Sequence, residues 1–154
     1  LKEDNKVSLA ISLHASNDEL RNNIVPINRS YPMSDLLSAC KRYTEEKEDD
    51  PITIEYVMLK DINDSLQDAH NLVKCLHNIP SKVNLIPFNK FPGAHFESSD
   101  YGVINAFRDV LIKSGIFAIT RKTRGDDIDA ACGQLVGKFL AKSIKHQKNT
   151  MELI

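Results

Sequence analysis

Cys132 is the residue of this 154-residue sequence whose type and surroundings most suggest covalent chemistry. It follows a charged loop and precedes Gly133 at the expected start of a helix. A helix N-terminus and nearby Arg or Lys side chains lower the pKa of a thiol, so Cys132 is a candidate reactive cysteine, with an inert thiol as the alternative. Cys40 and Cys75 fall within expected helices, where they are typical of small core or near-surface residues.

Polar residues also follow the ends of expected strands. Ser12 and His14 alternate with Leu13, and they could line a site for a small ligand or satisfy neighbouring backbone groups. Asn89 lies just past another strand, where an amide can contact an adenine edge or a ribose hydroxyl, or form a turn. No second His or Cys stands at ligand spacing from His14, so we predict no metal site.

Glu55 lies inside the strongest strand pattern, from Ile52 to Leu59. A carboxylate there must be paired or hydrogen-bonded, because burying it alone is costly. It is either a ligand-binding or catalytic acid or half of an ion pair. Asn84, in the following strand, is expected to point into the interior of a barrel.

A basic cluster follows the last expected strand. Arg121, Lys122 and Arg124 place three cations within four residues. They could contact phosphate or an RNA backbone. The alternative is a solvated loop that nearby aspartates partly neutralise.

The hydropathy pattern predicts alternating strands and helices. Strands are expected at 7–12, 52–59, 82–88 and 116–120, and helices at 18–24, 33–47, 65–77, 99–114 and 130–146. We expect Asn17 or Asp18, Ser34 with Asp35, and Asn63 or Asp64 to cap the first three helices. The apolar stripe of the 99–114 helix is expected to comprise Val103, Ile104, Phe107, Leu111 and Ile112, with Gly115 closing the helix. This order indicates an α/β fold with parallel strands, either a barrel segment or an open doubly wound sheet, and ligands of such folds bind at the carboxyl ends of the strands.

Composition restricts the class of protein. The net charge is −1, with 20 Lys+Arg against 21 Asp+Glu, so no global charge argues for a nucleic-acid partner. No apolar run approaches the roughly 18 residues of a membrane helix, so we predict no membrane association. Three widely spaced cysteines without a CxxC pair suit a reducing cytoplasm.

Several ordered strings are more specific than these patterns. They are Ser12-Leu13-His14-Ala15 followed by Asn17-Asp18, Arg21 and Val25-Pro26-Ile27-Asn28, then Glu55-Tyr56-Val57-Met58-Leu59, Asn84-Leu85-Ile86-Pro87-Phe88-Asn89, Phe91-Pro92-Gly93 and the run from Arg121 to Leu135 that contains Cys132. From about Val7 to Gly137 the sequence resembles the RlmN family, which are radical S-adenosylmethionine enzymes that methylate carbon 2 of adenine in ribosomal and transfer RNA.

The resemblance implies a role for each matching position. Ser12, Leu13, His14 and Asn89 match contacts to S-adenosylmethionine, and Cys132 matches the cysteine that is itself methylated. In the family, a 5′-deoxyadenosyl radical abstracts hydrogen from that methyl group, the carbon radical adds to the electron-poor adenine ring, and a second cysteine resolves the adduct. The resemblance also implies a disulfide bond, a [4Fe–4S] cluster, an external electron donor and a full-length enzyme that is a cytoplasmic monomer.

The sequence departs from the family because it has no CxxxCxxC cluster motif, and neither Cys40 nor Cys75 sits in a context that matches the resolving cysteine. We therefore expect the cluster ligands upstream of Leu1 and interpret the chain as the C-terminal half of a partial (β/α)6 TIM-type barrel. Residues 1–146 would form that part of the barrel domain with the cysteine segment, and 147–154 a flexible tail. Such a piece alone should be inactive.

Three alternatives remain open from the sequence. The chain could be a truncated remnant that at most binds RNA or docks with a separate half. It could belong to a Cfr-type enzyme that methylates carbon 8 of adenine. A cysteine hydrolase using Cys132 and His14 is the third, and it requires a base that a third group orients.

Overall fold

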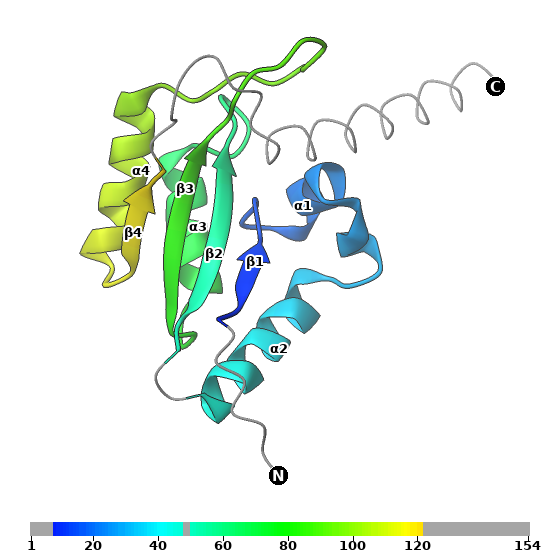
Figure 1. The fold of residues 1–154 in the computed structure, drawn as a ribbon, viewed down its shortest axis with the longest axis vertical. Coiled ribbons are helices and arrows are strands. Elements are labelled where there is room, and N and C mark those ends of the chain that lie inside the picture. Colours follow the sequence, from blue (N-terminus) through cyan, green and yellow to red (C-terminus); the bar gives the residue numbers. More distant parts are fainter. Residues whose placement is uncertain (1–7, 48–49, 122–154) are drawn as a thin grey trace, which may run out of the picture.

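A computed structural model describes residues 8–47 and 50–121 of the chain (Figure 1). The predicted Cys132 segment, the helix at 130–146 and the tail lie outside the described residues. The elements in chain order are β1 (Ala10–Ser12), α1 (Asp18–Ile24), the 3-10 helix η1 (Pro26–Arg29), α2 (Met33–Glu46), β2 (Ile52–Met58), α3 (Leu66–Cys75), β3 (Ser81–Pro87), α4 (Tyr101–Lys113) and β4 (Phe117–Thr120). Strands and helices therefore alternate as the sequence predicted.

The four strands form one parallel sheet in the order β1-β2-β3-β4. Helices connect β1 to β2, β2 to β3 and β3 to β4, which is the connection that parallel strands need. This arrangement confirms the predicted α/β class with parallel strands. Within the described residues the sheet is open, and its closure into a barrel stays a prediction.

One face of the sheet carries the main core. Ile52, Ile54, Tyr56 and Met58 of β2 alternate along that face, and each is at most 1% exposed. They pack with apolar side chains of the helices, which are Met33, Cys40, Ala69, Leu72, Ile104, Phe107 and Leu111. In Figure 1, α3 lies behind β2 and β3, α4 lies beside β4, and α1 and α2 lie on the side of β1.

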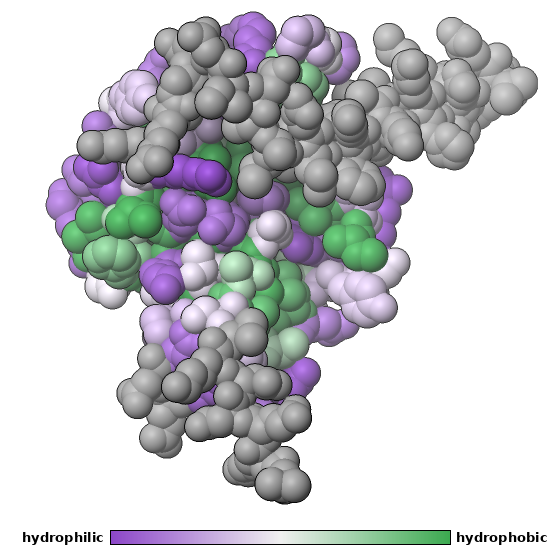
Figure 2. All heavy atoms as spheres, in the orientation of Figure 1, coloured by the Kyte–Doolittle hydropathy of each residue, from purple (hydrophilic) through white to green (hydrophobic). Residues whose placement is uncertain are grey.

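The other face, which we call the open face, is covered by no helix among the described residues. Its central row runs across the sheet in register from Ser12 through Glu55 and Asn84 to Ile119. Figure 2 views this face and shows hydrophobic side chains at its surface beside hydrophilic ones. Phe117 and Ile119 of β4, which are 65% and 49% exposed, belong to this face.

Two predicted helix caps were wrong. α2 begins at Met33 after Pro32, and Ser34 lies inside the first turn rather than capping it. α3 is capped by Ser65, whose hydroxyl accepts from the Asp68 backbone while the Asp68 side chain accepts from the Ser65 backbone. This reciprocal capping box satisfies two helix N–H groups, which explains why the cap falls there.

The stripe of α4 is narrower than predicted. Ile104, Phe107 and Leu111 are fully buried, whereas Val103 and Ile112 are 38% and 50% exposed. Gly115 follows the helix with a φ of 83°, as a closing glycine does. None of the helices among the described residues has the length and apolar character needed to cross a membrane.

Candidate functional site

The candidate site lies where the strands end. Because the strands are parallel, their carboxyl ends share one edge of the sheet, and ligands of α/β sheets bind at that edge. Ser12 ends β1 and is followed by Leu13 and His14, Asn89 follows β3, and Arg121 follows β4. Asn89 and Arg121 are exposed, and the backbone N–H of Arg121 donates to the carbonyl of Leu85 at 2.8 Å. The fold thus brings these five predicted residues to one edge.

Ser12 and Leu13 present different groups at this edge. Ser12 is exposed on the open face, where its hydroxyl is accessible. The side chain of Leu13 is 1% exposed and packs in the main core, so it faces away from the open face. Its backbone N–H donates to the carbonyl of Glu55 at 3.1 Å. Leu13 therefore anchors the strand end by packing.

Arg21 of α1 holds this strand end through its guanidinium group. Nη2 donates to the carbonyl oxygen of Ser12 at 3.2 Å, and Nε donates to that of Leu13 at 3.1 Å. Nη1 donates to Oδ1 of Asn28 at 2.6 Å. The side chain is 5% exposed, so these bonds form away from bulk water.

Asn28 connects Arg21 to a carboxylate. Its amide nitrogen donates to Asp18 at 2.7 Å, and Asp18 also accepts from the backbone N–H of Met33 at 2.8 Å. That backbone hydrogen bond, more than any other contact, lowers the pKa of Asp18. The Asp18 carboxylate therefore stays ionised at neutral pH. Its negative charge, linked to Arg21 through Asn28, compensates the positive charge of the buried guanidinium.

His14 adopts a left-handed backbone conformation with a φ of 61°. Its Nδ1 accepts a hydrogen bond from the backbone N–H of Val57 at 3.2 Å. Burial, and secondarily the charge of Arg21, lowers the pKa of His14 from 6.5 to about 4. The imidazole is therefore neutral at physiological pH and carries its proton on Nε2, which makes Nε2–H a hydrogen-bond donor.

Asn63 holds the same segment through its side-chain amide. Its amide nitrogen donates to the carbonyls of His14 at 2.9 Å and Val57 at 2.6 Å, and its oxygen accepts from Leu59 N–H at 2.7 Å. Asn63 is fully buried, and its carbonyl accepts from the Tyr56 hydroxyl at 2.8 Å. The sequence predicted a helix cap here, but the Asn63 side chain instead links the ends of β1 and β2. Its partner His14 lies 49 residues away in the sequence.

The geometry of His14 disfavours the hydrolase alternative. A general base needs an accessible lone pair, and the lone pair of Nδ1 is engaged by the Val57 backbone. The low pKa also makes His14 a weak proton acceptor at neutral pH. The other partner, Cys132, and the cations Lys122 and Arg124 lie outside the described residues.

Glu55 and Asn84 form the polar centre of the open face. The Asn84 amide nitrogen donates to both carboxylate oxygens of Glu55, at 3.0 and 3.2 Å. An ionised carboxylate only accepts, so this pairing fixes the amide orientation and directs Oδ1 away from Glu55. That oxygen is buried and has no hydrogen-bond partner among the described residues. The pair satisfies Glu55, as expected, and leaves one acceptor available.

The described cysteines do not form a metal or redox site. Cys40 is buried in the core, and the thiol of Cys75 donates to the carbonyl of Ser16 at 3.5 Å. Burial raises the pKa of both thiols. Both are free, and the described residues contain no cluster of His, Cys, Asp or Glu that could hold a metal ion.

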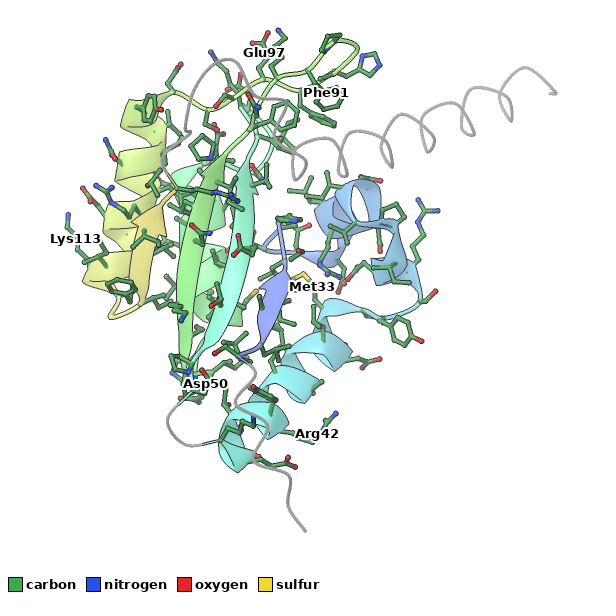
Figure 3. All side chains as sticks on the ribbon, in the orientation of Figure 1. Met33, Arg42, Asp50, Phe91, Glu97 and Lys113 are labelled. Atoms are coloured by element: carbon green, nitrogen blue, oxygen red, sulfur yellow. The ribbon has the colours of Figure 1, made fainter. Side chains whose placement is uncertain are left out.

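An aromatic loop borders the same edge. Phe88, at the end of β3, packs against Phe91 and Phe96 with ring centroids 6.1 and 6.2 Å apart. Figure 3 shows Phe91 and Glu97 in this loop, beyond the carboxyl ends of β2 and β3. Together with Ala15, Ile24, Val57 and Leu59, these rings form a second apolar cluster at the strand ends. Packed apolar side chains therefore support the strand-end edge.

Comparison with known proteins is consistent with this fold and edge. No family model matches the chain. The chain is 57% identical over 150 residues to the dual-specificity RNA methyltransferase RlmN of Alcanivorax borkumensis, covering 96% of the chain and 39% of that protein. The crystal structure of a radical SAM methyltransferase from Sphaerobacter thermophilus matches with a TM-score of 0.81 and 45% identity, covering 86% of the chain and 39% of that protein.

A third match shares the fold alone. It is a domain of a pyruvate-formate lyase-activating enzyme from Bacteroides vulgatus, at 14% identity with a TM-score of 0.57 over 74% of the chain and 66% of that domain. The two closer similarities are to a radical SAM methyltransferase and to a protein named RlmN, and each extends over most of this chain. The chain spans about two fifths of the length of these relatives.

Proposed function

We propose that the chain is part of an enzyme that methylates carbon 2 of an adenine in 23S ribosomal RNA and transfer RNA. The observation that carries this proposal is the 57% identity to a protein named a dual-specificity RNA methyltransferase, over nearly the whole chain. Identity at that level makes conservation of chemistry the simplest expectation. The strand-edge geometry supports it, because the residues matched to cofactor contacts lie at one edge.

Each predicted residue has a role in this proposal. Ser12, Leu13, His14 and Asn89 contact S-adenosylmethionine, with Leu13 contributing its backbone because its side chain is buried. Cys132 receives a methyl group and carries the one-carbon unit to the RNA. Arg121, Lys122 and Arg124 contact the RNA backbone, and exposure of Arg121 at the strand edge supports its part.

The described residues fit an adenosyl cofactor. Its amino and hydroxyl groups need acceptors, and its ring nitrogens need donors. The strand-end edge offers the Ser12 hydroxyl and the Nε2–H of neutral His14, and the neighbouring open face offers the unpartnered Oδ1 of Asn84 beside Glu55. S-adenosylmethionine would supply the methyl group and the radical, while these side chains bind and orient it.

The described residues do not fit a [4Fe–4S] cluster. Such clusters are held by several cysteine thiolates, whereas Cys40 is buried in the core and Cys75 donates to a backbone carbonyl. We therefore expect the cluster ligands, the resolving cysteine and the disulfide bond in parts of the enzyme beyond the described residues, and the electron donor is a separate molecule. We expect the complete enzyme to be a cytoplasmic monomer.

The test uses a chimera in which this chain replaces the matching 150 residues of the Alcanivorax borkumensis protein. The chimera should methylate ribosomal and transfer RNA, and digestion with mass spectrometry should yield 2-methyladenosine. Cys132→Ala should abolish the product, whereas Cys75→Ser should retain it. An 8-methyladenosine product would instead indicate the Cfr-type activity. No methylation by a folded, cluster-loaded chimera would indicate the inactive remnant.

A further inference from the structure

Three successive carbonyls at the end of β1 are each held by a buried side chain. The carbonyls of Ser12 and Leu13 accept from Arg21 at 3.2 and 3.1 Å, and that of His14 accepts from Asn63 at 2.9 Å. Arg21 and Asn63 come from different elements, at 5% and 0% exposure. Because both side chains are buried, neither is accessible to a ligand on the open face.

These bonds act where regular pairing stops. β1 pairs with β2 only through Ser12, and His14 leaves the sheet in a left-handed conformation that non-glycine residues avoid. Such a conformation persists when the surrounding contacts over-determine it. Arg21 fixes the backbone before the turn, and Asn63 fixes the turn itself while its second bond ties it to Val57.

We propose that Arg21 and Asn63 are positioning residues that hold the Ser12–His14 segment in its cofactor-binding conformation. This inference rests on the proposed function, in which that segment contacts S-adenosylmethionine. Because the segment is set before the cofactor arrives, binding need not order it. Loss of either tie should therefore weaken cofactor affinity more than it slows the chemical step.

The arrangement of acceptors around Arg21 explains why an arginine is needed at this position. Its planar group reaches two carbonyls and Asn28 at once, and Asn28 passes the interaction to Asp18. A lysine offers a single nitrogen, which cannot span these three acceptors. Arg21→Lys thus preserves the buried charge and removes the geometry.

The experiment compares Arg21→Lys and Asn63→Asp with wild type in the chimera described above. Asn63→Asp keeps the shape and the acceptor for Leu59 N–H while removing the donors to His14 and Val57. We expect the Kd for S-adenosylmethionine, measured by calorimetry, to rise about 10-fold or more for each variant. The KM for the cofactor should rise in parallel, with kcat changed by less than about threefold.

Matched controls are available on the surface. Arg29→Lys and Asn78→Asp change the same residue types at exposed positions and should leave the Kd at its wild-type value. If Asn63→Asp does not fold, Arg21→Lys carries the test. If that also fails, Asn28→Ala removes one of the three Arg21 bonds, and a Kd raised about threefold is expected.

Folded variants that bind S-adenosylmethionine as tightly as wild type would overturn the positioning role. A kcat that falls while Kd is unchanged would overturn it as well. The proposed function fails separately, if the wild-type chimera itself neither binds S-adenosylmethionine nor methylates RNA.

Discussion

The side-chain nitrogen of Asn84 lies 3.0 and 3.2 Å from the two carboxylate oxygens of Glu55 in the middle of the open face. The two residues are direct neighbours in the β2–β3 register. Asn84 therefore presents its donors to a carboxylate that has no ion-pair partner among the described residues. The pair makes a half-buried acid tolerable on a sheet face.

Asn84→Asp should destabilise the protein, because it replaces the donor with a second carboxylate at the same position. We expect the free energy of unfolding to fall by about 1–3 kcal/mol at pH 7. Part of the loss should be regained on acidification, because two neighbouring carboxyls can then share a proton. Urea unfolding of the variant and of wild type, at pH 7 and in mild acid, measures this. Asn105→Asp, at an exposed position on α4, should cost less than about 0.5 kcal/mol.

His14 should remain neutral well below the pH at which an ordinary histidine becomes charged. Its pKa of about 4 predicts that its imidazole ¹³C resonance stays constant from pH 8 to about 5. NMR of ¹³C-histidine-labelled protein measures this, with the resonance assigned by its loss in His14→Gln. A midpoint near 6.5 would show that the imidazole is solvated rather than bonded to Val57.

The same pKa makes stability depend on pH in a stated direction. Between pH 6.5 and about 4 the unfolded chain binds a proton at His14 that the folded chain does not, so stability falls as pH decreases through this window. The free energy of unfolding falls by about 3 kcal/mol by pH 4 because of His14. Above pH 6.5 His14 is neutral in both states, and its contribution to stability is fully present. His14→Gln should flatten this part of the urea-unfolding profile. The exposed His77, changed to Gln in the same way, controls for loss of a histidine as such.

Arg121 and Arg124 should contribute to RNA affinity through phosphate contacts. In the chimera, Arg121→Gln with Arg124→Gln should weaken RNA binding and reduce the slope of log K against log salt by about 0.7 for each lost contact on single-stranded RNA. Filter binding across salt concentrations measures this slope. Arg42→Gln with Lys113→Gln removes two cations far from the aromatic loop (Figure 3) and should leave the slope unchanged. An unchanged slope in the first variant would make those arginines structural.

The 154-residue chain on its own should self-associate through its open face. Ile119 exposes 49% of its surface beside Phe117 on β4, the last strand of the described sheet, and exposed apolar side chains that lie together favour association. Ile119→Lys should shift the chain toward monomer in sedimentation velocity. Ile112→Lys, which alters an isoleucine with 50% exposure on α4, should not. A monomeric wild-type chain with a cooperative thermal transition would contradict this expectation.

Local pattern was sufficient for the order and type of the elements. The β-branched run Ile52–Met58 and the apolar spacing of α3 and α4 each define their own element, because burial on one face imposes that period. Pro87 ends β3 as expected. Caps were harder to predict, because Ser34, Asn63 and Asp64 are all residue types that favour caps, and only backbone geometry selects among candidates two or three residues apart.

The roles of Arg21 and Asn63 could not be read from local sequence. Asn63 bonds to His14 across 49 residues, and Arg21 acts on carbonyls of a strand that its helix follows. Both side chains donate to backbone carbonyls at a strand end, because these carbonyls have no hydrogen-bond partner in the neighbouring strand. For Asn63 the available signal was a polar residue between a strand and a helix, and it was interpreted as a helix cap.

The bond from Arg121 N–H to Leu85 extends the β3–β4 ladder to the edge that carries Ser12 and His14. Cys132 comes 11 residues later, so the covalent chain confines its thiol within about 40 Å of that anchor. Confinement of this kind corresponds to an effective concentration on the order of millimolar. If Cys132 carries the methyl group as proposed, its covalent link to β4 sets the effective concentration of the methylated thiol at this edge. That concentration does not depend on how much enzyme the cell contains.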